Sequence, residues 1–89
     1  MLFSLGAVVA TPGALEALER AGDLPEQYLG RHEKGDWGDV CEEDWAENDF
    51  SVSRHLRIFS SYMLSDGTKL WIITEADRSA TTLLLPSEY

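Results

Sequence analysis

One histidine of this sequence has the setting of an acid–base residue. His32 follows Tyr28 and Leu29 at helical spacing, so the three side chains share one side of a predicted helix. An imidazole titrates near neutral pH and can act as a general acid or base. A lone histidine on an apolar helix side is also often a buried structural residue. Both interpretations of His32 stay open at this point.

Arginines gather around a predicted hairpin in the C-terminal half. Arg57 begins its first strand, and Arg78 lies in the turn that follows its second strand. Guanidinium groups and hydroxyls suit a phosphate or carboxylate, which predicts an anion site at this end of the sheet. The alternative is that the arginines form solvated ion pairs with nearby carboxylates. The candidate residues are Arg54, His55, Arg57, Thr74, Arg78 and Thr81.

Acidic side chains dominate the charge of the chain. The formal net charge is −9, and seven of the 16 acids lie between Asp36 and Asp49. Phosphate contacts need Lys and Arg, so this balance argues against a general nucleic-acid binder. The acidic run is either a solvated helix face or a surface for a basic protein. Its candidate partner-binding residues are Glu42, Glu43 and Asp44.

Metal and cofactor motifs are missing from the sequence. Two histidines and one cysteine have no zinc-site spacing, and the acidic run lacks EF-hand spacing. There is no glycine-rich phosphate loop and no nucleophile elbow. We therefore predict no metal and no cofactor. Cys41 is interpreted as a small buried residue of a helix stripe.

Length and composition predict one domain, residues 1–89. The 44% hydrophobic content is typical of a globular protein, and the one cysteine excludes an internal disulfide. No apolar stretch is long enough for a membrane span, and the first residues do not resemble a secretory signal. We expect a cytoplasmic protein without a membrane partner, either a monomer or a homodimer.

The N-terminal half predicts one strand and two to three helices. Residues 5–10 form a short apolar run typical of a buried strand. Thr11 caps a helix over residues 12–21. Asp23 is expected to cap a second helix that ends near Gly35. A third helix is expected over residues 37–48, where Trp37, Cys41 and Trp45 form an apolar stripe.

The C-terminal half predicts a hairpin and a third strand. The strands cover residues 57–64, 68–74 and 80–85, with Asp66-Gly67 as a two-residue turn. That register places Phe59 opposite Thr74. One sheet face then carries Phe59, Met63, Leu70 and Ile72, and the other carries Ile58, Tyr62, Leu64, Trp71 and Ile73.

Both faces of that sheet are largely apolar, so each needs a cover. The helices cover one face. The other face is covered by the first strand and the chain end, by a second copy, or by a partner. Tyr62 and Trp71 are its candidate contacts. The predicted fold class is α+β: an N-terminal strand and two to three helices packed on a C-terminal three-stranded antiparallel meander.

Several segments resemble a family of short, uncharacterised bacterial proteins that are labelled plasmid-related or hypothetical. The resemblance covers nearly the whole chain and implies no established activity. It rests on residues 11–15, Arg31-His32, residues 35–38, residues 71–82 and residues 85–89.

A second resemblance is to the barnase, EndoU and colicin-nuclease group of metal-independent ribonucleases. A helical half with a histidine precedes an antiparallel meander whose last strand carries Thr81-Thr82. The resemblance implies an RNA or phosphate ligand, with His32 as acid/base, Arg57 and Arg78 on the phosphate, and Thr81 positioning the substrate. The sequence thus supports two hypotheses: an anion- or RNA-directed module related to these enzymes, or a non-catalytic acidic protein that binds a basic partner.

Overall fold

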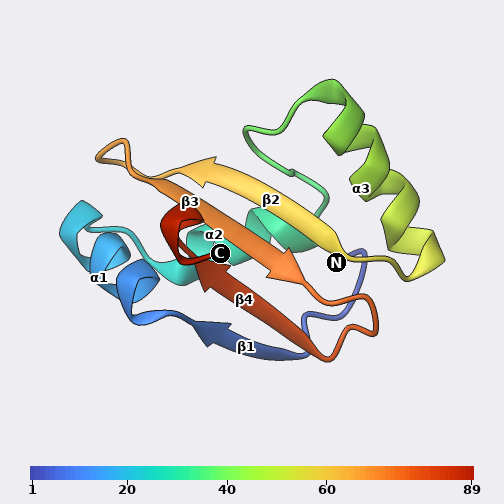
Figure 1. Cartoon of the computed structure of the whole chain (residues 1–89), viewed down its shortest axis with the longest axis horizontal. Coiled ribbons are helices and arrows are strands. Elements are labelled where there is room, and N and C mark those ends of the chain that lie inside the picture. Colours follow the sequence, from blue (N-terminus) through green and yellow to red (C-terminus); the bar gives the residue numbers. More distant parts are fainter.

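The computed structural model describes all 89 residues as an α+β protein with three α-helices and a four-stranded mixed sheet (Figure 1). No helix has the length and apolar character needed to cross a membrane. In chain order, the elements are β1 (Ala7–Ala10), α1 (Pro12–Ala21), α2 (Pro25–Glu33), α3 (Glu42–Arg54), β2 (Ile58–Met63), β3 (Lys69–Thr74), β4 (Ala80–Leu84) and the short 3-10 helix η1 (Pro86–Glu88).

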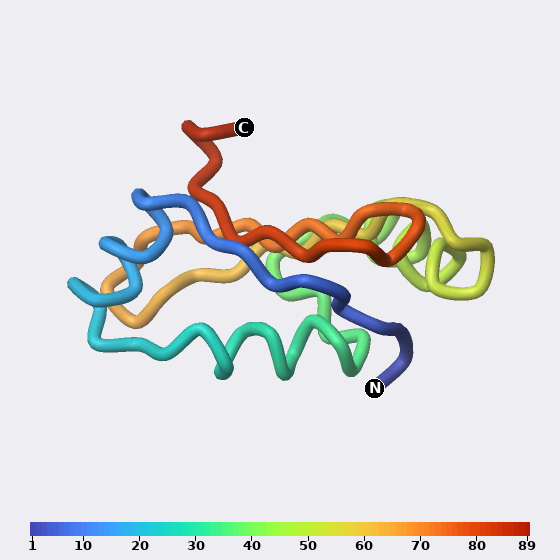
Figure 2. The backbone as a smooth tube through the Cα atoms, turned by 90° about the horizontal axis from the view of Figure 1, so that it is seen from below, coloured from blue at the N-terminus to red at the C-terminus, as the bar shows by residue number.

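The strand order in the sheet is β1-β4-β3-β2. The three C-terminal strands pair antiparallel in chain order, as predicted, but β1 extends the sheet by pairing parallel to β4. The expectation that the first strand packs on the sheet is therefore wrong, because β1 is one of its edge strands. In Figure 2, α2 lies on one side of the sheet and the C-terminal segment lies on the other.

The first strand is shorter and more exposed than the sequence suggested. It begins at Ala7, because Gly6 adopts φ +64° and a side chain there would collide with the Arg78 and Ser79 carbonyl oxygens. Val8 and Val9 are about half exposed, at 47% and 50%. The prediction of a buried strand over residues 5–10 is thus wrong, because β1 has a neighbouring strand on one side only.

The hairpin turn contains three residues, not two. The Leu64 amide donates to the Thr68 carbonyl, and the Leu64 carbonyl accepts from the Gly67 amide, with N···O distances of 2.8 and 2.9 Å. Gly67, at φ +90°, supplies the left-handed residue that such a three-residue loop requires. The predicted register is therefore wrong by one residue, and Phe59 pairs with Ile73 instead of Thr74.

This shift exchanges the two faces of β3. We call the helix-covered side the inner face and the opposite side the outer face. The outer face carries Trp71 and Ile73 together with Phe59, instead of the predicted Leu70 and Ile72. On the inner face, α1 and α2 bury one core cluster, whose members are Ala14, Ala17, Leu18, Tyr28, Tyr62, Leu64, Leu70, Ile72 and Leu83.

The first two helices begin at prolines, Pro12 and Pro25, and only the first of these starts was predicted. Thr11 caps α1 as expected, because its hydroxyl accepts from the Ala14 amide at 3.1 Å. The prediction that Asp23 caps α2 is wrong. The capping residue is Leu24, and the nearly buried Asp23 carboxylate instead accepts from the Tyr28 hydroxyl and the Ser65 amide. Asp23 thereby ties the start of α2 to the hairpin turn.

The third helix starts five residues later than predicted and continues to Arg54. Residues 37–41 form a loop along β2, where Gly38 at φ +76° makes a parallel bridge with Ser61. Trp37 is fully buried against Phe3 and Ile58, whereas Cys41 is exposed. The predicted buried stripe on one helix is therefore wrong, because burying Trp37 requires an extended chain beside the strand.

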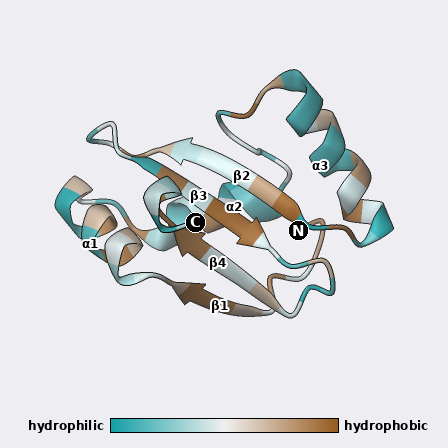
Figure 3. Cartoon of the chain, in the orientation of Figure 1, coloured by the Kyte–Doolittle hydropathy of each residue, from teal (hydrophilic) through white to brown (hydrophobic).

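Polar contacts attach α3 to the edge of β2. Its buried residues are Asn48 and Ser51, and most of the helix is hydrophilic (Figure 3). The side-chain amide of Asn48 donates to the Phe59 carbonyl at 2.6 Å and accepts from the Phe59 backbone amide at 3.1 Å. These two hydrogen bonds replace those that a neighbouring strand would make. The edge of β2 is therefore occupied by α3 and by the loop that contains Gly38.

Substitution of Gly38 by Ala should destabilise the protein by at least about 2 kcal/mol. A Cβ at this left-handed position would overlap the Ser61 carbonyl oxygen and the Tyr62 ring. Gly30→Ala is the matched control, because Gly30 is helical and has open space around it, and it should be neutral or stabilising. Urea unfolding of both variants checks this, and equal midpoints would contradict it.

Candidate functional site

His32 belongs to a buried chain of hydroxyl groups that crosses the inner face. Its Nδ1 lies 2.5 Å from the Ser60 hydroxyl of β2, and its Nε2 lies 2.9 Å from the Thr74 hydroxyl of β3. The Thr74 hydroxyl in turn lies 2.8 Å from that of Thr81 on β4, which donates to the Leu5 carbonyl at 2.7 Å. We call Ser60, His32, Thr74 and Thr81 the hydroxyl–imidazole chain.

The Leu5 carbonyl fixes the direction of every hydrogen bond in this chain. A carbonyl only accepts, so the single Thr81 proton points to Leu5 and Thr81 must accept from Thr74. Thr74 has then used its proton and must accept from His32 Nε2. Burial keeps the imidazole neutral, so the remaining nitrogen, Nδ1, carries no proton and accepts from Ser60. His32 is therefore the neutral Nε2–H tautomer.

The surroundings of His32 keep it uncharged. All four side chains of the hydroxyl–imidazole chain are at most 1% exposed, and Phe3 and Trp37 pack edge-on against the imidazole ring. Burial first, and then the positive charge of Arg78, lowers the pKa of His32 to about 3. A neutral, enclosed imidazole with both nitrogens bonded has no free position for proton exchange with a substrate.

Stability should fall with acid because of His32. Its pKa is about 3 in the folded state and about 6.5 when unfolded, so between these values only the unfolded chain binds the proton. The unfolding free energy should drop by roughly 1.4 kcal/mol per pH unit below about pH 6.5 from this group. His32→Gln should remove that part of the slope, whereas His55→Gln, at an exposed helix end, should keep it. Urea titrations at pH 4.5–7.5 measure the slope, and identical slopes for wild type and His32→Gln would contradict this.

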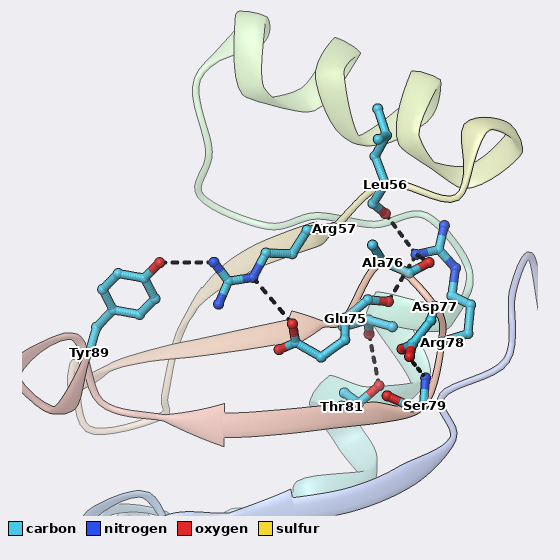
Figure 4. Close-up of polar contacts among 10 residues, drawn as sticks. Leu56, Arg57, Glu75, Ala76, Asp77, Arg78, Ser79, Thr81 and Tyr89 are labelled. Atoms are coloured by element: carbon cyan, nitrogen blue, oxygen red, sulfur yellow. Dashed lines mark hydrogen bonds and ion pairs between the residues drawn. The ribbon is translucent and has the colours of Figure 1, made fainter.

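Arg78 acts as a structural clamp in the turn between β3 and β4 (Figure 4). Its guanidinium donates to the Leu56 and Ser51 carbonyls at 2.7 and 2.8 Å, which fixes the end of α3. It also donates to the Glu75 and Ala76 carbonyls of its own turn. These four carbonyls use most of the donors that an anion would need.

Arg57 lies on the outer face and is more exposed than Arg78. Its side chain donates to the Tyr89 hydroxyl at 2.9 Å and lies 3.9 Å from the Glu75 carboxylate (Figure 4). The predicted register, which paired Phe59 with Thr74, would place Arg57 opposite Ala76, and this is wrong because the hairpin register shifts by one residue. Arg57 therefore retains free donors at the surface, next to an aromatic ring.

The other predicted anion-site residues point elsewhere. Arg54 is the last residue of α3, and its guanidinium stacks on Phe50 at 4.8 Å. His55 is exposed and ends α3 in a left-handed conformation at φ +53°. Thr74 and Thr81 are enclosed in the hydroxyl–imidazole chain. The structure thus joins His32 to both threonines and keeps Arg54, His55 and Arg57 outside this cluster.

The two arginines of the predicted anion site should differ in their effect on stability. Arg78→Gln should destabilise the fold by about 2 kcal/mol, because it leaves partly buried carbonyls without donors. Arg57→Gln should cost less than about 1 kcal/mol, since its contacts are half exposed. Thermal unfolding of both variants checks this, and an equal loss would contradict the clamp.

The outer face holds a pocket of about 210 Å³. Phe59 and Trp71 meet edge-to-face with ring centroids 5.0 Å apart, and Tyr89 closes the third side at 5.8 Å from Trp71. Ile73 contributes an apolar wall, and Arg57 stands at the rim above the Tyr89 ring. Ser61 is the cross-strand neighbour of Trp71, and its buried hydroxyl has no hydrogen-bond partner.

The acidic candidates lie away from the core. The exposed first turn of α3 contains Glu42, Glu43 and Asp44. Their carboxylates are stabilised there by the positive end of the helix dipole. No three His, Cys, Asp or Glu side chains converge on a common point. Of the two predicted sheet-face contacts, Trp71 lines the pocket, but Tyr62 is buried on the inner face, where its hydroxyl donates to the Asp36 carbonyl.

The sequence did not indicate that Phe59, Ile73 and Tyr89 line a pocket or that Ser60 contacts His32. The two-residue turn placed Phe59 and Trp71 on opposite faces, so their pairing was hidden. A three-residue turn, with Gly67 in the left-handed position, would have placed Phe59, Trp71 and Ile73 together. The sequence offers no signal that Tyr89 folds back onto this face.

Comparisons with protein-family models, with curated proteins and with solved structures give no match. Both family resemblances therefore stay predictions.

Proposed function

We propose that this protein is a non-catalytic interaction protein that binds a basic partner protein through its outer face. The observation that carries the proposal is the pocket formed by Phe59, Trp71, Ile73 and Tyr89, with Arg57 at its rim. The pocket lies on the side of the sheet that the three helices leave open. Only the C-terminal segment reaches that side (Figure 2).

The composition of the pocket suits a protein interface. Trp, Tyr and Arg are the residue types most enriched among the few side chains that dominate binding energy. Trp71, Tyr89 and Arg57 are already held by ring contacts and by the Arg57–Tyr89 hydrogen bond. Such preorganised side chains lose little conformational entropy on binding. The pocket volume fits one apolar side chain of a partner.

Charge indicates the kind of partner. The chain carries 16 acidic and seven basic side chains, so its field attracts a positively charged surface and repels an acidic one. Arg57 adds little positive potential, because Glu75 lies beside it. A basic protein that inserts an apolar anchor into the pocket satisfies both features, and the exposed acids of α3 add long-range attraction.

The ribonuclease hypothesis has less support from this geometry. It needs His32, an arginine and Thr81 around a space that a phosphate can enter. His32 and Thr81 have no exposed surface, and both nitrogens of His32 are bonded. Arg78 is committed to backbone carbonyls. Catalysis by His32 would require the hydroxyl–imidazole chain to open.

Replacement of Trp71 by Ala should weaken partner binding by at least about tenfold, because it removes one wall of the pocket. The partner is first isolated by affinity capture on the purified protein, and its affinity is then measured by calorimetry. Trp45→Ala is the matched control. Trp45 is also partly exposed, at 37%, but lies on α3 outside the pocket, so its removal should leave the affinity unchanged.

The salt dependence of the affinity tests the same complex independently. The affinity should fall as the salt concentration rises, and reversal of the charges of Glu42, Glu43 and Asp44 to Lys should reduce this dependence. Binding that survives Trp71→Ala, or that does not respond to salt, would contradict the proposed function.

A further inference from the structure

The outer edge of β1 is open. Strand β1 pairs with β4 on one side and has no neighbour on the other, and in Figure 2 it crosses in front of the sheet. The amides of Ala7 and Thr11 donate to the Ser79 and Leu83 carbonyls at 3.0 Å each, so alternate residues of this strand face β4. The N–H and C=O groups of Val8 and Ala10 therefore point away from the sheet. Such an edge is a template for another strand.

The opposite edge of the sheet, at β2, is protected from pairing with another strand. On β2, the Asn48 side chain and the loop at Gly38 occupy the outward backbone groups. Nothing comparable covers β1, which also lacks the lysine, proline or bulge that blocks edge pairing in other proteins. Val8 and Val9 add half-exposed apolar side chains to these unpaired groups.

The charge distribution favours a second copy of the chain as the partner of the β1 edge. The first 15 residues contain no Asp, Glu, Lys or Arg, although the chain as a whole has a net charge of −9. A basic partner would therefore find no acid on β1 itself. Two acidic copies, in contrast, can meet here without placing carboxylates face to face. Acids flank the strand only at its ends: Glu88 contacts Thr11 and Gly13 at one end, and Asp77 accepts from the Ser79 amide in the turn beside the other.

The outward groups allow one antiparallel register with full pairing. Residues that exchange hydrogen bonds must both direct their backbone groups outward, so Val8 pairs with Ala10 of the other copy and Ala10 pairs with its Val8. This arrangement gives four hydrogen bonds. It stops there, because Pro12 has no N–H and Gly6 leaves the strand at φ +64°. Val9 then lies on the two-fold axis, opposite Val9 of the other copy.

We propose that two copies of this chain associate through antiparallel pairing of their β1 strands, with Val9 facing Val9 across a two-fold axis. The sequence Ala7-Val8-Val9-Ala10 reads the same in both directions, and in this register Val8 meets the small Ala10 of the other copy. The two sheets become one continuous sheet. In the antiparallel arrangement, Glu88 of each copy lies toward the Gly6 end of the other strand and not toward the second Glu88.

The dimer is reversible and strengthens with salt. The contact is four residues long, which is at the small end of specific interfaces. Each copy carries a net charge of −9, so salt reduces the repulsion between copies. This direction is opposite to that expected for a basic partner. The two interfaces can therefore be told apart in one salt series.

A disulfide tests the register. In the Cys41→Ser background, Val9→Cys should give a disulfide-linked dimer on mild oxidation, because non-hydrogen-bonded pairs place Cα atoms about 4.5 Å apart. Val8→Cys is the matched control at a similarly exposed position. Its sulfur faces Ala10 of the other copy, and the introduced thiols of the two copies are diagonal neighbours about 7 Å apart, so this variant should remain unlinked.

Sedimentation velocity over a concentration series tests the association without cysteines. The wild type and Val9→Thr should dimerise, and Val9→Glu should remain monomeric because it places two carboxylates on the axis. The result that overturns the proposal is a wild type that is monomeric in high salt at millimolar concentration, or equal cross-linking of the Val8→Cys and Val9→Cys variants. A monomer would leave this edge to a strand of another protein.

Discussion

One carbonyl oxygen, that of Leu5, orients the polar interior of this protein. It accepts the Thr81 proton and thereby sets the donor and acceptor at each step to Thr74, His32 and Ser60. The hydroxyl–imidazole chain joins the N-terminal segment, α2 and three strands of the sheet. Each of its groups is buried and bonded, so the loss of any one leaves a desolvated partner, which costs about 1–3 kcal/mol. We conclude that the hydroxyl–imidazole chain specifies how the helical layer packs on the sheet.

This arrangement separates two roles that the sequence had combined. The imidazole and the threonine hydroxyls serve the interior, and Arg78 binds backbone carbonyls next to them. The exposed chemistry lies on the other side of the sheet, where Arg57 stands over aromatic rings. Since every strand residue alternates between these two sides, a shift of one residue in β3 moves Trp71 from the interior to the surface. The position of Gly67 in the hairpin loop therefore decides which residues lie on the outer face.

The sequence predicted the local elements better than their partners. Thr11 and Pro12 mark the start of α1 by local chemistry, and the structure confirms them. The start of α3 depends instead on Trp37, whose burial against Phe3 is a tertiary contact that no helical period reveals. The same holds for His32. Its helix position was predictable, but Ser60 and Thr74 reach it from strands that lie 28 and 42 residues further along the chain.

Nitrogen NMR of the His32 ring tests the central claim most directly, because it reports the protonation of both ring nitrogens. The account predicts a neutral Nε2–H tautomer, with Nδ1 as acceptor, that does not change between pH 7.5 and pH 5, since its pKa is about 3. A ring that titrates near pH 6.5, or one protonated on Nδ1, would contradict the directed chain from Leu5 to Ser60. It would also return His32 to consideration as an acid–base residue.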